Sequence, residues 1–129
     1  MNKVFLIMLG GSIGALSRYY LSGIINKAGN SLFPIGTLAV NILGCFIIGF
    51  LWGMLNWKIE ILPEAKVFIF IGFLGAFTTF SSYALESYNM FYEGEIKYAV
   101  LNILYNNIFG ISAVIFGSML WRTIVKVFK

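Results

Sequence analysis

The chain consists mainly of four long apolar stretches separated by short polar segments. A helix needs roughly 17–25 predominantly apolar residues to cross a bilayer, and each stretch reaches that length. The stretches are Val4–Ile25, Gly36–Leu55, Val67–Leu85 and Tyr98–Trp121. We therefore predict an all-α, multi-pass membrane protein with four transmembrane helices, which form a single domain over residues 1–129.

The polar segments between these stretches are typical of connections. Asn26–Ile35 contains glycine, asparagine and proline, and Asn56–Lys66 contains Pro63, both of which indicate turns. The segment Glu86–Lys97 holds three of the five acidic residues. It is predicted to be a polar connection between the third and fourth spans.

Composition supports the membrane assignment and excludes several classes of function. Hydrophobic residues make up 60% of the chain and charged residues 11%, against roughly 45–50% and about 25% in soluble domains. The net charge is +4, but the basic residues do not cluster, so nucleic acid is not an expected partner. With no histidine and a single cysteine inside a span, neither a metal cluster nor a disulfide framework is available. Enzyme motifs are absent, so no catalytic residues are predicted.

The third stretch is unusual for a membrane span. Between Gly72 and Tyr83 it combines two glycines, four hydroxyl residues and four aromatic residues. Because lipid offers no hydrogen-bond partners, such a segment is costly unless it faces a polar path or an ion. A helix break near Gly75–Thr79 would free carbonyl groups for a cation and helix N-termini for an anion. Phe80 and Tyr83 share a face, where their electropositive edges suit a small anion and simple packing is the alternative.

The first two spans carry further small and polar residues. Gly10 and Gly14 form a surface that allows close helix packing. Arg18 lies near the end of its span, where anchoring is favoured over contact with an anion. Thr37 and Asn41 share a face of the second span, and Asn41 suits either hydrogen bonding between helices or the lining of a pore.

Span four leaves two interpretations open. Asn102 and Asn106 share a face, with Tyr105 and Ser112 on the same helix, and both pore lining and interhelical hydrogen bonding fit. No acidic residue is expected in the core of a span, so a proton carrier is missing and a passive anion pore is favoured. Because four spans without an internal repeat make a thin wall, two copies are expected to complete the site.

Three motifs in the first three spans point to one family. They are Gly10-Gly11-x-x-Gly14-Ala15-x-x-Arg18-Tyr19, Gly36-Thr37-Leu38-x-Val40-Asn41-x-x-Gly44-x-Phe46-x-x-Gly49 and Gly72-Phe73-x-Gly75-x-x-Thr78-Thr79-Phe80-Ser81. With these motifs, the chain resembles the Fluc (CrcB) family of bacterial fluoride ion channels. The resemblance implies an antiparallel, dual-topology homodimer with two passive fluoride pores in the bacterial inner membrane. Accumulated fluoride would leave the cytoplasm through them.

The resemblance also implies roles for individual residues. Asn41 matches the pore asparagine and Phe80 the first pore phenylalanine, while Tyr83 stands where most relatives have a second phenylalanine. Backbone carbonyls at Gly75 and Thr78 match the site of a structural Na⁺ at the dimer centre. The hydroxyl-bearing positions along the fluoride path correspond to Thr37, Ser81 and Ser82.

Two other functions and one other assembly are kept as alternatives. A proton-coupled small multidrug exporter has a similar size but relies on a glutamate in the first span, which this chain lacks. A non-transporting membrane scaffold subunit would leave the polar residues of the third span unexplained. In span four, Asn102 and Asn106 replace the tyrosine and serine of many relatives, which keeps a non-identical partner chain open as well.

Overall fold

The computed structural model describes residues 2–29, 32–56 and 61–127, and the described part is helical without strands. Four segments are long and apolar enough to cross a membrane, which confirms the predicted all-α class and number of spans. The helices are α1 (Lys3–Gly29), α2 (Ile35–Asn56), α3 (Pro63–Lys66), the π-helical η1 (Val67–Leu74), α4 (Gly75–Phe77), α5 (Phe80–Tyr92) and α6 (Ile96–Val127).

The third apolar segment runs from Pro63 to Tyr92 and comprises four of these elements, from α3 to α5. It thus continues past Leu85, its predicted end. The prediction that Glu86 begins a polar connection is therefore wrong, because this residue lies inside α5.

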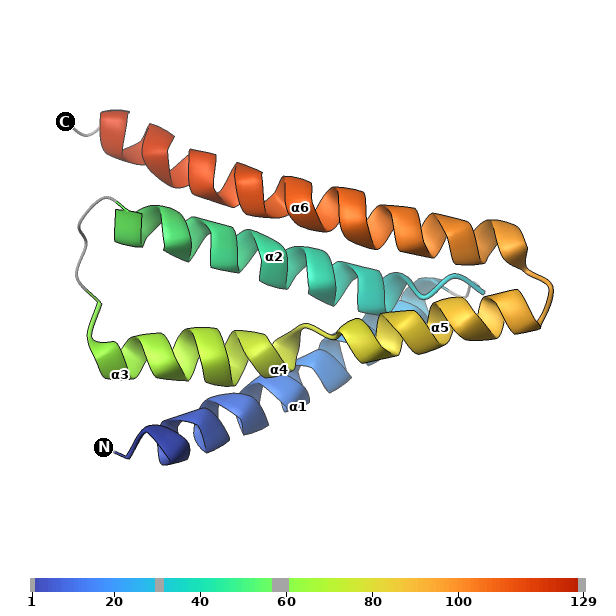
Figure 1. Cartoon of the computed structure of the whole chain (residues 1–129), viewed down its shortest axis with the longest axis horizontal. Helices are drawn as coiled ribbons and strands as arrows, with labels where there is room; N and C mark the ends of the chain where they lie inside the picture. Colours follow the sequence, from blue (N-terminus) through green and yellow to red (C-terminus); the bar gives the residue numbers. More distant parts are fainter. Residues whose placement is uncertain (1, 30–31, 57–60, 128–129) are drawn as a thin grey trace.

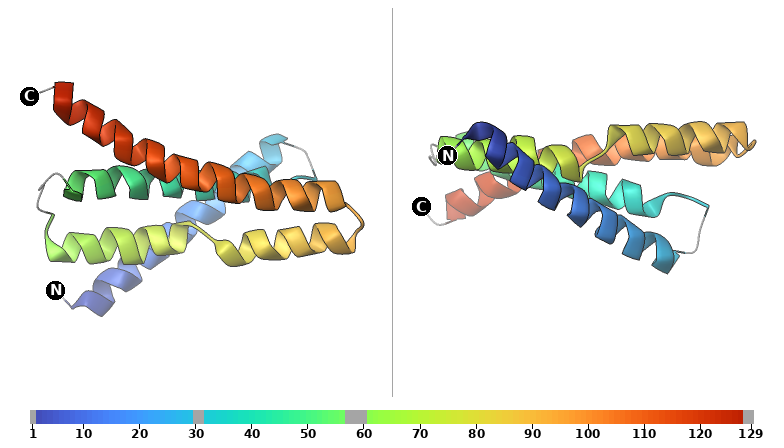
Figure 2. Two further views of the ribbon diagram at one scale, coloured as in Figure 1. Left: turned by 45° about the horizontal axis from the view of Figure 1, so that its top comes forward. Right: turned by 90° about the horizontal axis from the view of Figure 1, so that it is seen from below.

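The helices form an elongated bundle in which α6 lies along α2 and the third segment lies on the other side of α2 (Figure 1). α1 crosses the bundle obliquely and packs against η1 and α4 (Figure 2). The start of α1 and the end of α6 lie at the same end of the bundle, as an even number of crossings requires.

Glycines set the distance between α1 and the third segment. A Cβ atom at Gly14 would collide with the carbonyl oxygen of Phe73, and one at Gly10 would lie 2.5 Å from the carbonyl oxygen of Phe68. The two backbones are therefore in contact, as the small-residue pattern of α1 predicts. This contact holds η1 and α4, which precede the functional site, against α1.

We expect Gly14→Ala to lower the stability of the protein by about 1–3 kcal/mol, because the added methyl group forces the backbones apart. Gly11→Ala is the matched control, since a Cβ at Gly11 has no neighbour within 4 Å. Thermal unfolding of both variants in the same detergent measures the difference. Equal melting temperatures would contradict the close contact.

Candidate functional site

The third span is interrupted between α4 and α5. α4 ends at Phe77 and α5 begins at Phe80, while Thr78 (φ −83°, ψ 157°) and Thr79 (φ −147°, ψ 116°) are extended. The N–H of Thr78 still donates to the carbonyl of Leu74 at 3.1 Å. In a continuous helix the N–H of Thr79 would donate to the carbonyl of Gly75, and the interruption removes that partner.

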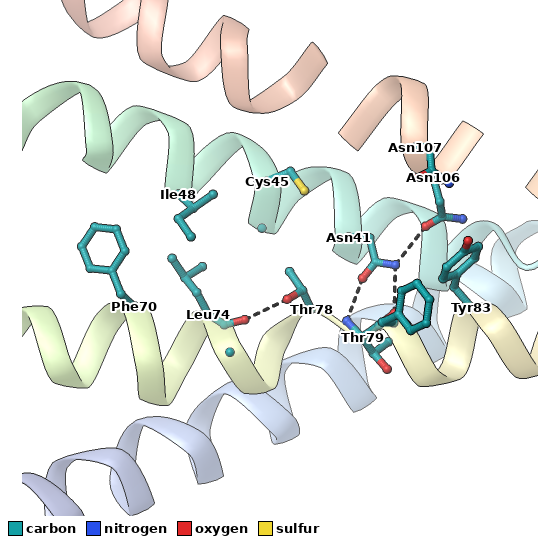
Figure 3. A pocket seen from close by; sticks show the side chains of 13 residues that line it. Asn41, Cys45, Ile48, Phe70, Leu74, Thr78, Thr79, Tyr83, Asn106 and Asn107 are labelled. Atoms are coloured by element: carbon teal, nitrogen blue, oxygen red, sulfur yellow. Dashed lines mark hydrogen bonds between the residues drawn. The ribbon is translucent and has the colours of Figure 1, made fainter. Parts of the chain in front are cut away.

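The side chain of Asn41 replaces the missing partner of the Thr79 N–H. Its Oδ1 accepts from the N–H of Thr79 at 2.8 Å, and its Nδ2 donates to the carbonyl oxygen of Thr79 at 3.1 Å. The second Nδ2 proton is donated to Oδ1 of Asn106 at 2.9 Å (Figure 3). A carboxamide has two N–H donors, so both donors of Asn41 are engaged.

Thr79 also caps α5 with its side chain. Its Oγ1 accepts from the N–H of Ser82 at 3.2 Å and donates to Oγ of Ser82 at 3.0 Å. A side-chain oxygen at this position satisfies one of the free N–H groups at a helix start. Ser81 is exposed, and its Oγ lies 3.4 Å from Oγ1 of Thr79.

A first cavity of about 340 Å³ lies beside the interruption. The predicted residues that line it are Asn41, Gly75, Thr78, Phe80 and Tyr83. Within it the rings of Phe80 and Tyr83 meet edge to face, with centroids 5.1 Å apart and planes at 75°. The side chain of Phe80 is 77% exposed, so in a single chain this part of the cavity wall is open.

A second cavity of about 330 Å³ lies on the α1 side of the interruption. It is lined by the predicted residues Thr37 and Ser82, together with Arg18 and Glu86. Thr79 lines both cavities. The predicted residues are thus divided between two adjoining cavities, and Ser81 lines neither.

Glu86 corrects the expectation that no acid lies in a span. It is half-buried, and its Oε1 accepts a hydrogen bond of 2.5 Å from Oγ1 of Thr37. Its Oε2 and Nε of Arg18 are buried without a hydrogen-bond partner in the described part of the chain. Arg18 lines the same cavity, so the acid and a cation share a polar space within the span.

The sequence analysis assigned no role in the site to Glu86 or Thr79, although the sequence around each residue indicates one. A threonine directly before a predicted helix start is a favoured cap. Glu86 follows Ser82 by one helical turn, which places the two on one face. For Asn102 and Asn106, the four-residue spacing did locate a polar face, and both take part in hydrogen bonds between helices.

The donor set around the interruption suits a hard monovalent cation better than a transition metal. Among the described residues, no group of three or more His, Cys, Asp or Glu side chains comes together. The carbonyl of Gly75 has lost the N–H of Thr79 to Asn41, and Gly75 itself is exposed. Oxygen ligands of this kind fit a cation such as Na⁺.

Comparisons with known proteins agree on one family. The family model described as CrcB-like protein, Camphor Resistance (CrcB), matches residues 5–118. Similar proteins named fluoride-specific ion channel FluC occur in Desulforapulum autotrophicum, with 41% identity over 95% of this chain and 98% of the relative, and in Parabacteroides distasonis, with 40% identity over the full length of both. A relative with the same name in Pyrococcus furiosus is 38% identical over 95% of this chain and 98% of its own length. Ion channels are not enzymes, in agreement with the sequence analysis.

We expect Asn41→Ala to leave the N–H of Thr79 without a partner and to destabilise the start of α5. Each unpaired buried group costs about 1–3 kcal/mol. Hydrogen–deuterium exchange of a peptide covering residues 76–82 should therefore become faster. Asn107→Ala is the control, because the Asn107 amide donates to the carbonyl of Ile103 in its own helix at 2.7 Å. Unchanged exchange in Asn41→Ala would contradict the pairing.

Proposed function

The chain belongs to the CrcB family, and on this basis we propose that it is a passive, fluoride-selective ion channel. The observation that carries the proposal is the first cavity, which the Asn41 amide and the rings of Phe80 and Tyr83 line beside an interrupted span. Amide N–H groups and aromatic edges are electropositive, so they can replace the water around a small anion. Curated relatives at about 40% identity carry the name fluoride-specific ion channel.

The path proposed for the ion follows the start of α5. Hydroxyl groups of Ser82 and Thr37 lie in the second cavity, with the guanidinium of Arg18, and Thr79 separates this cavity from the first. Fluoride would exchange water for the donors along this path in sequence, and the Thr37 hydroxyl would turn from Glu86 to the ion. In this proposal Ser81, exposed beside Thr79, provides a further hydroxyl at the surface of the single chain.

We assign the assembly to two copies of the chain in antiparallel orientation, with two pores. The support is the exposure of Phe80, at 77%, and of Gly75, because a pore lined by these residues is open until another surface covers it. A closed two-fold pair is the commonest way to supply such a surface. The lipid bilayer surrounds the pair, and we place it in the bacterial inner membrane, where it lets accumulated fluoride leave the cytoplasm.

A Na⁺ ion between the two copies completes the proposed assembly. The carbonyl groups of Gly75 and Thr78 would hold it, since the interruption releases carbonyls that a continuous helix would engage. The ion would supply positive charge and tie the two interrupted spans together. Both spans would then present the starts of their α5 helices at fixed positions.

Liposomes that contain only this chain test the function directly. We expect rapid efflux of fluoride down its gradient, no comparable efflux of chloride, and no dissipation of an imposed proton gradient. Because Glu86 lies within a span, the measurement of the proton gradient is informative. Proton flux coupled to an organic cation would favour a small multidrug exporter instead. Absence of any flux would favour a scaffold subunit.

Phe80→Ile tests the anion path without disturbing the packed interior. The Phe80 side chain contributes little to packing within one chain, so each chain of the variant should fold normally, and gel filtration measures whether the pair still forms. We expect its fluoride efflux to fall at least 100-fold, a loss of about 3 kcal/mol of transition-state stabilisation. Phe91→Ile is the matched control, because Phe91 is an exposed phenylalanine on the same helix that lines neither cavity. Efflux of Phe80→Ile equal to that of the control would exclude Phe80 from the path.

Removal of sodium tests the proposed cation. We expect purification in N-methylglucamine chloride in place of sodium chloride to weaken the pair of chains, because the carbonyls at the interruptions lose their shared cation. Light scattering after gel filtration measures the mass of the protein, and return of sodium should restore the dimer. A dimer of unchanged mass and melting temperature without sodium would contradict the assignment.

A further inference from the structure

A directed chain of five hydrogen bonds connects three helices beside the first cavity. The N–H of Thr79 donates to Oδ1 of Asn41 at 2.8 Å, and Nδ2 of Asn41 donates to Oδ1 of Asn106 at 2.9 Å. Nδ2 of Asn106 donates to Oδ1 of Asn102 at 2.9 Å, and Nδ2 of Asn102 donates to Oγ of Ser87 at 3.0 Å. Ser87 closes the chain by donating to the carbonyl of Tyr83 at 2.8 Å.

The two ends of this chain determine the orientation of every amide in it. A backbone N–H can only donate, so Asn41 must turn its oxygen towards Thr79. A backbone carbonyl can only accept, so the Ser87 oxygen must accept from Asn102. Asn102 is fully buried, with 0% exposure, and cannot turn to water. Asn106 therefore faces Asn41 with its oxygen.

A rotation of the Asn106 amide by half a turn would lose three hydrogen bonds. Its nitrogen donates to both the carbonyl and Oδ1 of Asn102, at 3.0 and 2.9 Å, and its oxygen accepts from Asn41. After rotation, its oxygen would face two oxygens of Asn102 with no proton between them. The second Asn41 donor thus pairs with the Asn106 oxygen, whose orientation is fixed by the two hydrogen bonds from Asn106 to Asn102.

We propose that Asn106 is a positioning residue that occupies the Asn41 donor in the empty pore and yields it to fluoride. The inference rests on the proposed channel function. Of the two acceptors on Asn41 Nδ2, the Thr79 carbonyl belongs to the backbone at the start of α5, while the Asn106 oxygen ends a half-buried side chain on the cavity wall. An ionised acceptor forms a stronger hydrogen bond than a neutral amide oxygen, so fluoride can compete for this proton while Asn106 keeps its orientation. The fixed oxygen then takes up the proton again as the ion leaves.

The expected effect is a change in the fluoride concentration that gives half-maximal efflux. Asn106→Leu removes the competing oxygen, so this concentration should fall about fivefold, the equivalent of one neutral hydrogen bond, and the maximal efflux rate should fall because release slows. A purely structural role would lower the amount of active protein and leave the half-maximal concentration unchanged. Asn89→Leu is the control, since Asn89 is an exposed residue of α5 that lines neither cavity.

A double variant controls for misfolding of Asn106→Leu. Asn106→Leu leaves Oδ1 of buried Asn102 without a donor, whereas the double variant Asn102→Leu/Asn106→Leu leaves no unpaired amide on α6, and Ser87 still donates to Tyr83. In both variants the second Asn41 donor is free for the ion. Replacement of both partners by apolar groups of similar size is often nearly neutral for stability. The double variant should show the same fivefold fall.

A measurement on the unmodified protein is independent of both variants. With ¹⁵N-labelled asparagine side chains, addition of sodium fluoride should shift one of the two Asn41 amide protons and leave the Asn106 protons nearly unchanged. Two results would exclude the role of Asn106 in an unmodified chain that carries fluoride. One is an unchanged half-maximal concentration in both variants, and the other is the absence of a shift in either Asn41 proton. If the unmodified chain carries no fluoride, the proposed function itself fails.

Discussion

The pairing between the Asn41 amide and the backbone of Thr79 is the interaction on which the rest of the site depends. A span surrounded by lipid cannot leave the N–H of Thr79 unpaired, and the carboxamide accepts from this N–H and donates to the carbonyl of the same residue. The pairing needs α2 to lie close to the interruption. Gly44 permits this approach, because a Cβ there would collide with the methyl group of Thr78.

Several features of the site follow from this pairing. Once Thr78 and Thr79 are extended, α5 begins a new helix with Thr79 as its cap, and Phe80 and Tyr83 point together into one cavity. Thr79 lines both that cavity and the one lined by Arg18 and Glu86. The amides of α6 continue the pairing behind Asn41, so the orientation of a single side chain on α2 depends on three helices.

The sequence predicted the spans and the unusual segment better than it predicted the partners of individual residues. Gly72–Tyr83 was identified by its glycines, hydroxyls and aromatics, and the extended residues Thr78 and Thr79 lie inside it. Glu86 was assigned to a connection because an acid interrupts an apolar stretch. In the fold, the Thr37 hydroxyl pairs with one oxygen of the carboxylate, and the side chain lines a cavity together with Arg18 within the span. Hydropathy counts an acid as a break and contains no term for a partner on another helix.

The sequence by itself determined that four apolar segments cross a membrane and that the third contains residues unsuited to an uninterrupted helix. These are local properties, since length, hydropathy and helix propensity belong to neighbouring residues. Only the tertiary structure decided which polar groups meet. Asn41 contacts Thr79 and Asn106 across 38 and 65 residues of chain, and Thr37 contacts Glu86 across 49. Such pairs depend on the relative position and rotation of packed helices, which no local pattern specifies.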